Sequence, residues 1–245
     1  MTNSDTSQPE ATIGERLSGA STGTIVLLLE RLGFRGCYMT GVGPVTPSTC
    51  FAGPARTVRC LPTRPDVVEQ QRQSGSPSMH KQAIDGISQG DVLVIDTRGT
   101  RDAAVMGDLF AERMKVAGAV GVVADGCIRD AAEISKVGIP VYASGLHNAT
   151  LGNRLVTMDI GMPIACGGVL VMPGDYLVGD SMGVVVIPKQ LVGKVLDAMP
   201  AQEELDTFIR EKIQEGLTLA RAYPPDEVLQ MEYRAWVERR RAESR

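Results

Sequence analysis

Four charged residues lie where apolar stretches of this sequence end, and their types are those that bind metal ions and oxyanions. Asp125, Arg129 and Asp130 follow the apolar run 119–124, and Asp108 directly precedes an amphipathic stretch upstream. A charged group beside an apolar core costs free energy, so we expect chemistry to require these side chains. We therefore predict that the two segments, 107–108 and 121–130, form the working site.

The residue types indicate which chemistry this would be. Asp108, Asp125 and Asp130 offer hard oxygen ligands without a cluster of histidines or cysteines. Such ligands favour Mg²⁺ or Mn²⁺ over Zn²⁺, and a small number of them leaves room for water and substrate. The planar guanidinium of Arg129 suits a carboxylate or an enolate oxygen. Together these groups would hold and polarise a small 2-oxo acid.

Each of these residues also has a plainer interpretation. Asp108 and Asp130 are suitable helix N-caps, and Arg129 has adjacent carboxylates with which to pair. Asp125 is followed by Gly126, and Asp-Gly is a common turn pair. The residues alone leave these alternatives open.

Other candidates are weaker. We expect His80 to be a surface histidine in a polar loop, although it could face the site, and His147 follows a strand end that lines the same rim. Cys127 lies inside the second turn without an evident base nearby, so we expect a packed small residue rather than a nucleophile.

The elements that must position the site follow a β-α-β order. A buried strand at 92–96, a helix at 108–117 and a strand at 119–124 predict a parallel pair with a right-handed crossover. Both charged turns then lie at the carboxyl end of the sheet, where open α/β sheets bind ligands and where helix N-termini favour anions.

The rest of the chain is expected to mix short strands and helices. The predicted segments are a helix at 21–32, strands within 36–63, a loop or short helix at 65–78, a helix at 81–87, a short helix at 130–136, a strand at 138–143, a loop-rich passage at 148–160, strands within 163–188, and helices at 191–199, at 203–215 and through Trp236.

Composition narrows the class of protein. With 245 residues, 43% of them hydrophobic, the chain can bury a full core, and its net charge of −4 and pI near 5.3 argue against a nucleic-acid partner. Five cysteines without close pairs suggest a reducing, cytoplasmic setting. We expect residues 1–12 to be a loose or disordered tail, and no stretch long enough for a membrane span.

Asp108, a gap of twenty residues and Arg129-Asp130 resemble the D-x20-R-D signature of the RraA-like family. That family includes class II 4-hydroxy-4-methyl-2-oxoglutarate / 4-carboxy-4-hydroxy-2-oxoadipate aldolases and regulators of ribonuclease activity. The resemblance extends over residues 21–188 and is reinforced by the segments 173–175 and 183–188. It implies an α/β fold, a swivelling α/β/β domain over residues 13–190 with a C-terminal helical arm at 191–245, assembled as a homotrimer or homohexamer with sites at subunit interfaces.

The resemblance also implies roles for particular residues. Asp130 matches the position that binds the divalent metal, Asp108 the one that holds metal-bound water, and Arg129 the one that binds the pyruvyl oxygen. A glutamate from a neighbouring subunit is also used in the family, and the matching positions here are Glu203 or Glu204. The pyruvate carboxylate would be bound by the backbone amides of Gly107, Asp108, Leu109 and Phe110. Where family members have an aspartate in the first helix, this chain has Leu27.

These expectations predict a lyase that depends on Mg²⁺ or Mn²⁺ and cleaves a 4-hydroxy-2-oxo acid to pyruvate, with oxaloacetate decarboxylase activity beside it. The metal and Arg129 would stabilise the pyruvate enolate, and no lysine lies in the motif to form a Schiff base. The alternative is a non-catalytic regulator that binds a ribonuclease through an acidic oligomeric surface. A third possibility is a sugar-acid dehydratase that uses the same metal and enolate chemistry.

Overall fold

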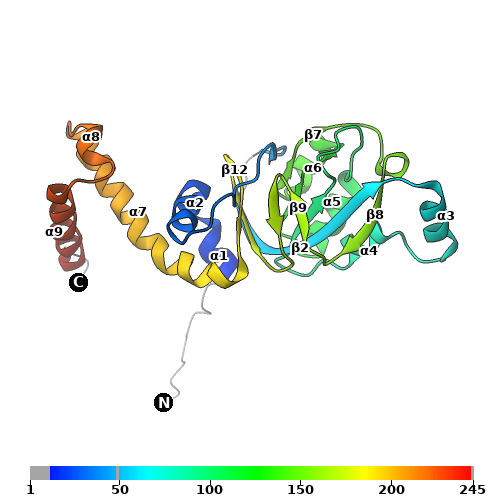
Figure 1. The fold of residues 1–245 in the computed structure, drawn as a ribbon, viewed down its shortest axis with the longest axis horizontal. Coiled ribbons are helices and arrows are strands. Elements are labelled where there is room, and N and C mark those ends of the chain that lie inside the picture. The colour runs from blue at the N-terminus through cyan, green and yellow to red at the C-terminus, as the bar shows by residue number, and fades with distance from the viewer. Residues whose placement is uncertain (1–11, 48–49, 244–245) are drawn as a thin grey trace, which may run out of the picture. The chain divides into compact units, whose positions relative to one another are not determined.

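The computed structural model describes residues 12–47 and 50–243, which form two compact units, one ending at Val192 and the other starting at Gly193 (Figure 1). Residues 1–11, where the sequence predicts a loose tail, lie outside the described part of the chain. Thr12 caps the first helix: its hydroxyl accepts from the amide of Glu15, and its own amide donates to the Glu15 carboxylate.

An eight-stranded mixed sheet forms the first unit. Its strands run in the order β1-β6-β4-β3-β2-β11-β12, with β8 also paired to β2. The bounds are β1 Gly43–Pro44, β2 Phe51–Pro62, β3 Val92–Asp96, β4 Gly121–Ala124, β6 Val141–Ala143, β8 Leu155–Ile160, β11 Tyr176–Asp180 and β12 Gly183–Ile187. The strands β2, β3, β4 and β6 are parallel, as predicted for the β-α-β unit.

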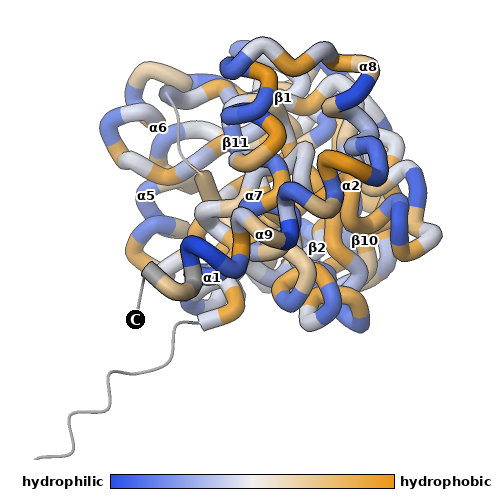
Figure 2. The backbone as a smooth tube through the Cα atoms, turned by 90° about the vertical axis from the view of Figure 1, so that its left-hand side faces the viewer, coloured by the Kyte–Doolittle hydropathy of each residue, from blue (hydrophilic) through white to orange (hydrophobic). Residues whose placement is uncertain are grey.

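Helices and short strands complete this unit. The helices are α1 Ile13–Ser18, α2 Thr22–Arg31, α3 Pro65–Gln73, α4 Met79–Asp85, α5 Asp108–Val116 and α6 Ala131–Val137, with 3-10 turns at Leu151–Asn153 and Lys189–Leu191. The short strands are β5 Cys127–Ile128 paired with β7 Gly145–Leu146, and β9 Ile164–Cys166 paired with β10 Val169–Val171. The apolar sequence of α2 is visible as orange backbone in Figure 2.

Both faces of the central strands are buried, and alternate residues face different layers. Leu93 and Ile95 of β3 pack with residues of α4, α5 and α6, whereas Val92 and Val94 pack with residues of β9 to β12. Helices therefore cover one face of the central strands, and the β9-β10 pair together with β11 and β12, from the end of the same sheet, cover the other. Strands buried on both sides read as continuous apolar runs, which is why they were visible in the sequence.

Two predicted segments were wrong. The passage 148–160, expected to be loop-rich, contains β8, a strand paired to β2 in which Thr157 and Asp159 alternate with apolar Val156, Met158 and Ile160. The expected break between helices at 199 and 203 is absent from the described chain, because α7 runs from Val192 to Gln214 through Pro200.

The second unit contains α7 beyond Val192, α8 Leu219–Ala222 and α9 Glu227–Glu243. Its own small core is formed by Phe208, Ile209, Ala222 and Leu229, with Tyr233 and Trp236 packed against it. The indole of Trp236 donates to Glu211 (3.1 Å), and the Tyr233 hydroxyl donates to the carbonyl of Ala201 (3.2 Å), so polar contacts tie α9 to α7.

Candidate active site

The two turns predicted to form the site lie side by side. The amide of Val105 donates to the carbonyl of Cys127 (2.9 Å), and the amide of Arg129 donates to the carbonyl of Met106 (2.9 Å). These backbone hydrogen bonds join the segment before α5 to the segment before α6. The twenty-residue gap in the sequence therefore separates residues that adjoin in space, as the motif predicted.

Gly107 is the point where the turns come closest. A Cβ placed on Gly107 would lie 2.7 Å from Oδ2 of Asp130 and 3.0 Å from Nε of Arg129. The backbone of Gly107 is extended, with φ −132°, so a left-handed conformation does not explain the glycine. A side chain at this position would have to displace the carboxylate and the guanidinium, because both rest directly against the main chain.

Asp130 departs from the plain helix-cap interpretation. It occupies the N-cap position of α6, but its side chain makes no cap hydrogen bond, and its backbone is left-handed with φ 58°. Its Oδ2 instead lies 3.2 Å from Nε of Arg129, with the two side chains 36% and 41% exposed. The carboxylate is thus turned toward Arg129 and Gly107. The ion pair predicted between the adjacent charges is formed, and it lies at the predicted site.

Asp108 is not the cap of its helix either. Gly107 holds the N-cap position, and Asp108 is the first residue of α5, where a negative charge is favourable. Its Oδ1 accepts from the amide of Leu109 at 2.8 Å. The carboxylate therefore lies at the helix N-terminus, beside the glycine that contacts Arg129 and Asp130.

A pocket of about 230 Å³ opens at this place. Its wall includes each residue predicted to bind substrate, namely Gly107, Asp108, Leu109, Phe110 and Arg129. The other lining residues are Ser78, His80, Lys81, Ala104, Val105, Met106, Thr150, Leu151 and Gly152. Asp130 is absent from this lining. Its carboxylate lies behind the wall, next to two residues that do line the pocket, Arg129 and Gly107.

The expectation for His80 was wrong. It is only 6% exposed and lines the pocket, with its ring packed against Phe110 at 5.6 Å between centroids. Burial lowers its pKa below 6.5, although its hydrogen bond to the carbonyl of Val105 acts in the opposite direction. The sequence did hold a signal: His80, Ala83 and Ile84 have i, i+3, i+4 spacing, so His80 continues the apolar face of α4.

The remaining candidates have structural roles. Oδ1 of Asp125 accepts from the amide (2.6 Å) and hydroxyl (2.8 Å) of Thr97, and its Oδ2 accepts from the amide of Gly99 (3.2 Å). Burial raises the pKa of Asp125, and these bonds partly offset the increase. Burial also raises the pKa of the Cys127 thiol, which disfavours the thiolate that a nucleophile requires. His147 is part-exposed, accepts from the amide of Ala149 and does not line the described pocket.

Glu203 and Glu204 belong to the second unit. Both lie on α7 and have exposed side chains. Their predicted role in a neighbouring subunit's site stays a prediction.

The carboxylates near the pocket suit one class of metal ion. Within residues 12–47 and 50–243 there is no group of three or more histidine, cysteine, aspartate or glutamate side chains that could hold a metal. Asp108 follows Gly107 in the chain, and the carboxylate of Asp130 lies against the same glycine. Mg²⁺ is commonly bound by one or two carboxylates, with water and substrate completing the octahedron. The donor set therefore fits Mg²⁺ or Mn²⁺ and not a structural zinc site.

A match over most of the chain decides the family. The family model described as RraA-like, Aldolase/RraA, matches residues 12–186. The chain belongs to the RraA-like family. Membership confirms the resemblance drawn from the D-x20-R-D spacing, and the layers described above confirm the predicted α/β fold.

Relatives of this RraA-like chain carry two kinds of name. A protein of Halalkalibacterium halodurans, provisionally named 4-hydroxy-4-methyl-2-oxoglutarate aldolase, is 33% identical over 182 residues, which are 74% of this chain and 80% of that protein. The crystal structure of Streptomyces coelicolor RraAS2, described as an unusual member of the RNase ES inhibitor RraA protein family, is 29% identical with a TM-score of 0.73 and covers 82% of this chain and 97% of its own.

A third relative extends the structural similarity. The crystal structure of an uncharacterized protein from Pseudomonas syringae pv. tomato is 27% identical, covers 86% of this chain and 96% of its own, and also has a TM-score of 0.73. None of the helices in the described part of this chain combines the length and apolar character that crossing a membrane demands.

Proposed function

We propose that this RraA-like protein is a divalent-metal-dependent class II aldolase that cleaves a 4-hydroxy-2-oxo acid and releases pyruvate, with oxaloacetate decarboxylation as a second activity. The observation that carries the proposal is the pocket itself. In it the guanidinium of Arg129 and the N-terminus of α5 face one space, with the carboxylate of Asp130 at its edge.

The N-terminus of α5 is proposed to bind the substrate carboxylate. The first amides of a helix have no acceptor within the helix, and the helix dipole favours an anion there. The amide of Leu109 donates to the Asp108 carboxylate, so binding through Leu109 requires Asp108 to turn away. The same movement would free Asp108 to exchange a proton with the substrate.

Arg129 is proposed to bind the 2-oxo oxygen. Its Nε is held at 3.2 Å by Asp130, so the Nη nitrogens are the part of the fork that would reach a substrate oxygen. Hydrogen bonds from a guanidinium strengthen as negative charge develops on that oxygen. Arg129 would therefore stabilise the enolate more than the ground state.

The bond changes follow ordinary retro-aldol chemistry. A base removes the 4-hydroxyl proton, the C3–C4 bond breaks, and its electron pair forms the enolate of pyruvate, which then gains a proton at C3. A Mg²⁺ or Mn²⁺ ion held by Asp130, with Asp108 nearby, would supply Lewis-acid polarisation of the 2-oxo group. We assign the proton transfers to Asp108 and, in a homotrimer or homohexamer, to Glu203 or Glu204 of a second copy.

The test is metal-dependent pyruvate release, measured by a lactate dehydrogenase coupled assay on oxaloacetate and on 4-hydroxy-2-oxo acids. Arg129→Ala and Asp130→Ala should each lower kcat/KM by at least about a hundredfold. Full activity in both variants, or no turnover with any divalent metal, would sink the proposal. Metal-dependent turnover without pyruvate would support the dehydratase alternative.

A second candidate function is regulation of a ribonuclease by direct binding. The observation that favours it is the similarity to RraAS2, whose description names an RNase ES inhibitor family. Inhibition of a purified RNase E-type enzyme that survives Arg129→Ala and Asp130→Ala would support this function. A cytoplasmic location and the trimeric or hexameric state are also proposals, and light scattering on the purified protein decides the latter.

A further inference from the structure

His80 makes two hydrogen bonds that involve both ring nitrogens. Its Nε2 lies 2.7 Å from the carbonyl oxygen of Val105, and its Nδ1 lies 3.0 Å from the hydroxyl of Thr157. The three residues come from α4, from the segment before α5 and from β8. The side chain is buried at the wall of the pocket, so neither bond competes with bulk water.

The chemistry of the partners determines where the proton lies. A carbonyl oxygen can only accept, so Nε2 carries the hydrogen, and in the neutral ring Nδ1 is then the acceptor. The Thr157 hydroxyl therefore donates to Nδ1, which leaves its lone pairs for the thiol of Cys60 at 3.5 Å. Burial raises the pKa of Cys60 to about 11, so this thiol keeps its proton and can donate. One direction of donation satisfies the whole series from Cys60 through Thr157 and His80 to Val105.

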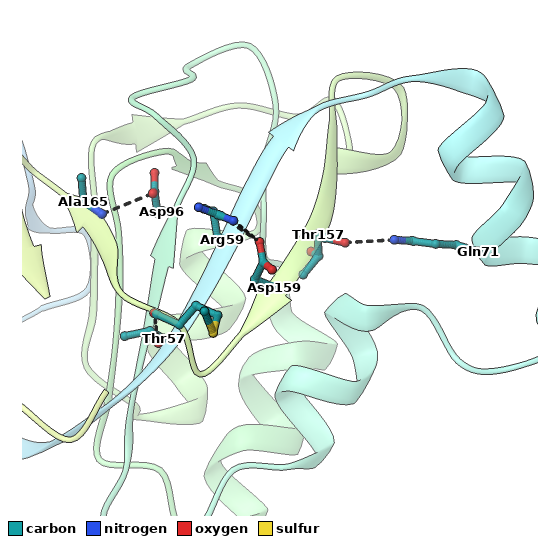
Figure 3. Close-up of polar contacts among 8 residues, drawn as sticks. Thr57, Arg59, Gln71, Asp96, Thr157, Asp159 and Ala165 are labelled. Atoms are coloured by element: carbon teal, nitrogen blue, oxygen red, sulfur yellow. Dashed lines mark hydrogen bonds and ion pairs between the residues drawn. The ribbon is translucent and has the colours of Figure 1, made fainter. Parts of the chain in front are cut away.

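Thr157 is itself fixed in place. It pairs with Cys60 in the register of β8 and β2, and its carbonyl accepts from the side-chain amide of Gln71 (3.1 Å), as Figure 3 shows. The hydroxyl that orients His80 thus belongs to a strand of the central sheet. The imidazole is held by the sheet on one side and holds the pocket segment on the other.

The segment that His80 holds leads directly to the substrate site. The amide of Ala104 donates to the carbonyl of Ala149 (2.7 Å), and hydrogen bonds from Val105 and to Met106 join the segment to the turn that carries Arg129. The hydrogen bond from His80 to the carbonyl of Val105 links this segment to α4. Gly107 lies two residues after Val105, and α5 begins at the next residue, Asp108.

We propose that His80, held in the Nε2–H form by the Val105 carbonyl with its Nδ1 bonded to the Thr157 hydroxyl, is a positioning residue that fixes the segment Val105–Gly107 and hence the α5 N-terminus opposite Arg129. The inference rests on the proposed function for its catalytic consequence. Its structural content, the tautomer and the fixed segment, can be measured without any turnover.

The spectroscopic test is ¹⁵N NMR of histidine-labelled protein. The chain has two histidines, so His147→Gln leaves His80 as the one labelled ring. We expect a single neutral Nε2–H tautomer at pH 7, and Thr157→Val should shift the Nδ1 resonance because that nitrogen loses its hydrogen-bond donor. An Nδ1–H tautomer, or a spectrum that Thr157→Val leaves unchanged, would overturn the inference.

The kinetic test compares two replacements of the same ring. Loss of the contact displaces groups that must be aligned, so His80→Leu should lower kcat/KM for pyruvate release about ten- to a hundredfold and raise KM. His80→Gln, which keeps an N–H donor, should recover most of this loss and restore slow amide exchange in the segment 105–107. Equal losses in the folded Leu and Gln variants would count against a positioning role.

The outcomes separate this inference from the proposed function. If the wild-type protein releases no pyruvate with any metal, the aldolase proposal fails, and the tautomer and the amide exchange still decide the role of His80. If His80→Leu does not fold, the spectra of Thr157→Val and the exchange rates of His80→Gln give the answer.

Discussion

Gly107→Ala is the substitution for which this structure makes its sharpest prediction. The change adds one methyl group and leaves every side chain of the motif chemically intact. An ordinary contact begins at about 3.4 Å, whereas the new Cβ would lie 2.7 Å from Oδ2 of Asp130, so the carboxylate must move by about 0.7 Å. Nε of Arg129, 3.0 Å from the same point, must move by about 0.4 Å.

The expected loss follows from these displacements. Misplacement of a reacting group by about 1 Å costs about a hundredfold in rate. Movement of both charged groups by somewhat less should lower kcat/KM about ten- to a hundredfold, or about 1.4–2.7 kcal/mol in the barrier. Because φ at Gly107 is −132°, alanine fits the backbone, and lower entropy of the unfolded chain should stabilise the fold by about 0.4–1 kcal/mol.

The assay measures pyruvate release and the melting temperature of the same preparation. Gly19→Ala is the matched control, because a Cβ there meets no atom within 4 Å and the effect on the unfolded chain is alike. Reduced kcat/KM with an unchanged or higher melting temperature is the expected result. A Gly107→Ala enzyme within twofold of wild type would refute the reasoning that Arg129 and Asp130 must rest against this glycine.

The buried histidine, a pocket lysine and the thiols each yield one further prediction. Burial lowers the pKa of His80 below 6.5, so the unfolded chain binds a proton that the folded chain resists. The free energy of unfolding should fall below pH 6.5 by up to about 1.4 kcal/mol per pH unit, and this pH dependence should be weaker in His80→Gln, as denaturant titrations will show. Lys81 lines the pocket, so its ammonium group could pair with a second carboxylate at the end of the substrate remote from the 2-oxo acid. Lys81→Met should lower kcat/KM about tenfold for such substrates and leave it unchanged for 4-hydroxy-2-oxopentanoate, which lacks that carboxylate. Equal losses on both substrates would contradict a role for the lysine charge. Burial raises the pKa of Cys60 to about 11 while Cys50 is exposed, so a thiol reagent should label Cys50 in the native protein and Cys60 only after unfolding, as peptide mass spectrometry can check.

The parts of the fold that could be predicted are those whose information is local. The strands β3 and β4 are buried on both faces, and the residues between them show helical periodicity, so the parallel pair and its crossover followed from the sequence. The proximity of Gly107 to Arg129 followed in turn, because both turns leave neighbouring parallel strands at the same edge. Strand β8 was missed because Thr157 and Asp159 interrupt its apolar residues, and the burial of Thr157 depends on partners distant in sequence.

The parts of the site that could not be predicted depend on distant partners. His80 contacts Thr157, 77 residues away, and nothing in the polar sequence around His80 specifies that contact. Whether an aspartate before a helix caps it or turns elsewhere also depends on its surroundings. The local rule predicted a possible cap at Asp130, whereas the side chain makes no cap hydrogen bond and lies against Arg129.

The left-handed backbone of Asp130 explains how two sequence neighbours can serve one site. In a helix or a strand, adjacent side chains point in different directions, so Arg129 and Asp130 would diverge in either structure. With φ at 58°, the chain reverses its local direction and brings the Asp130 carboxylate back to Nε of Arg129 and to the main chain of Gly107. Left-handed backbone in a residue other than glycine costs about 1–3 kcal/mol, and no cap hydrogen bond offsets that cost. The left-handed backbone of Asp130 and the missing side chain of Gly107 therefore act together. The first turns the Asp130 carboxylate toward Arg129, and the second leaves room for both charged groups against the main chain.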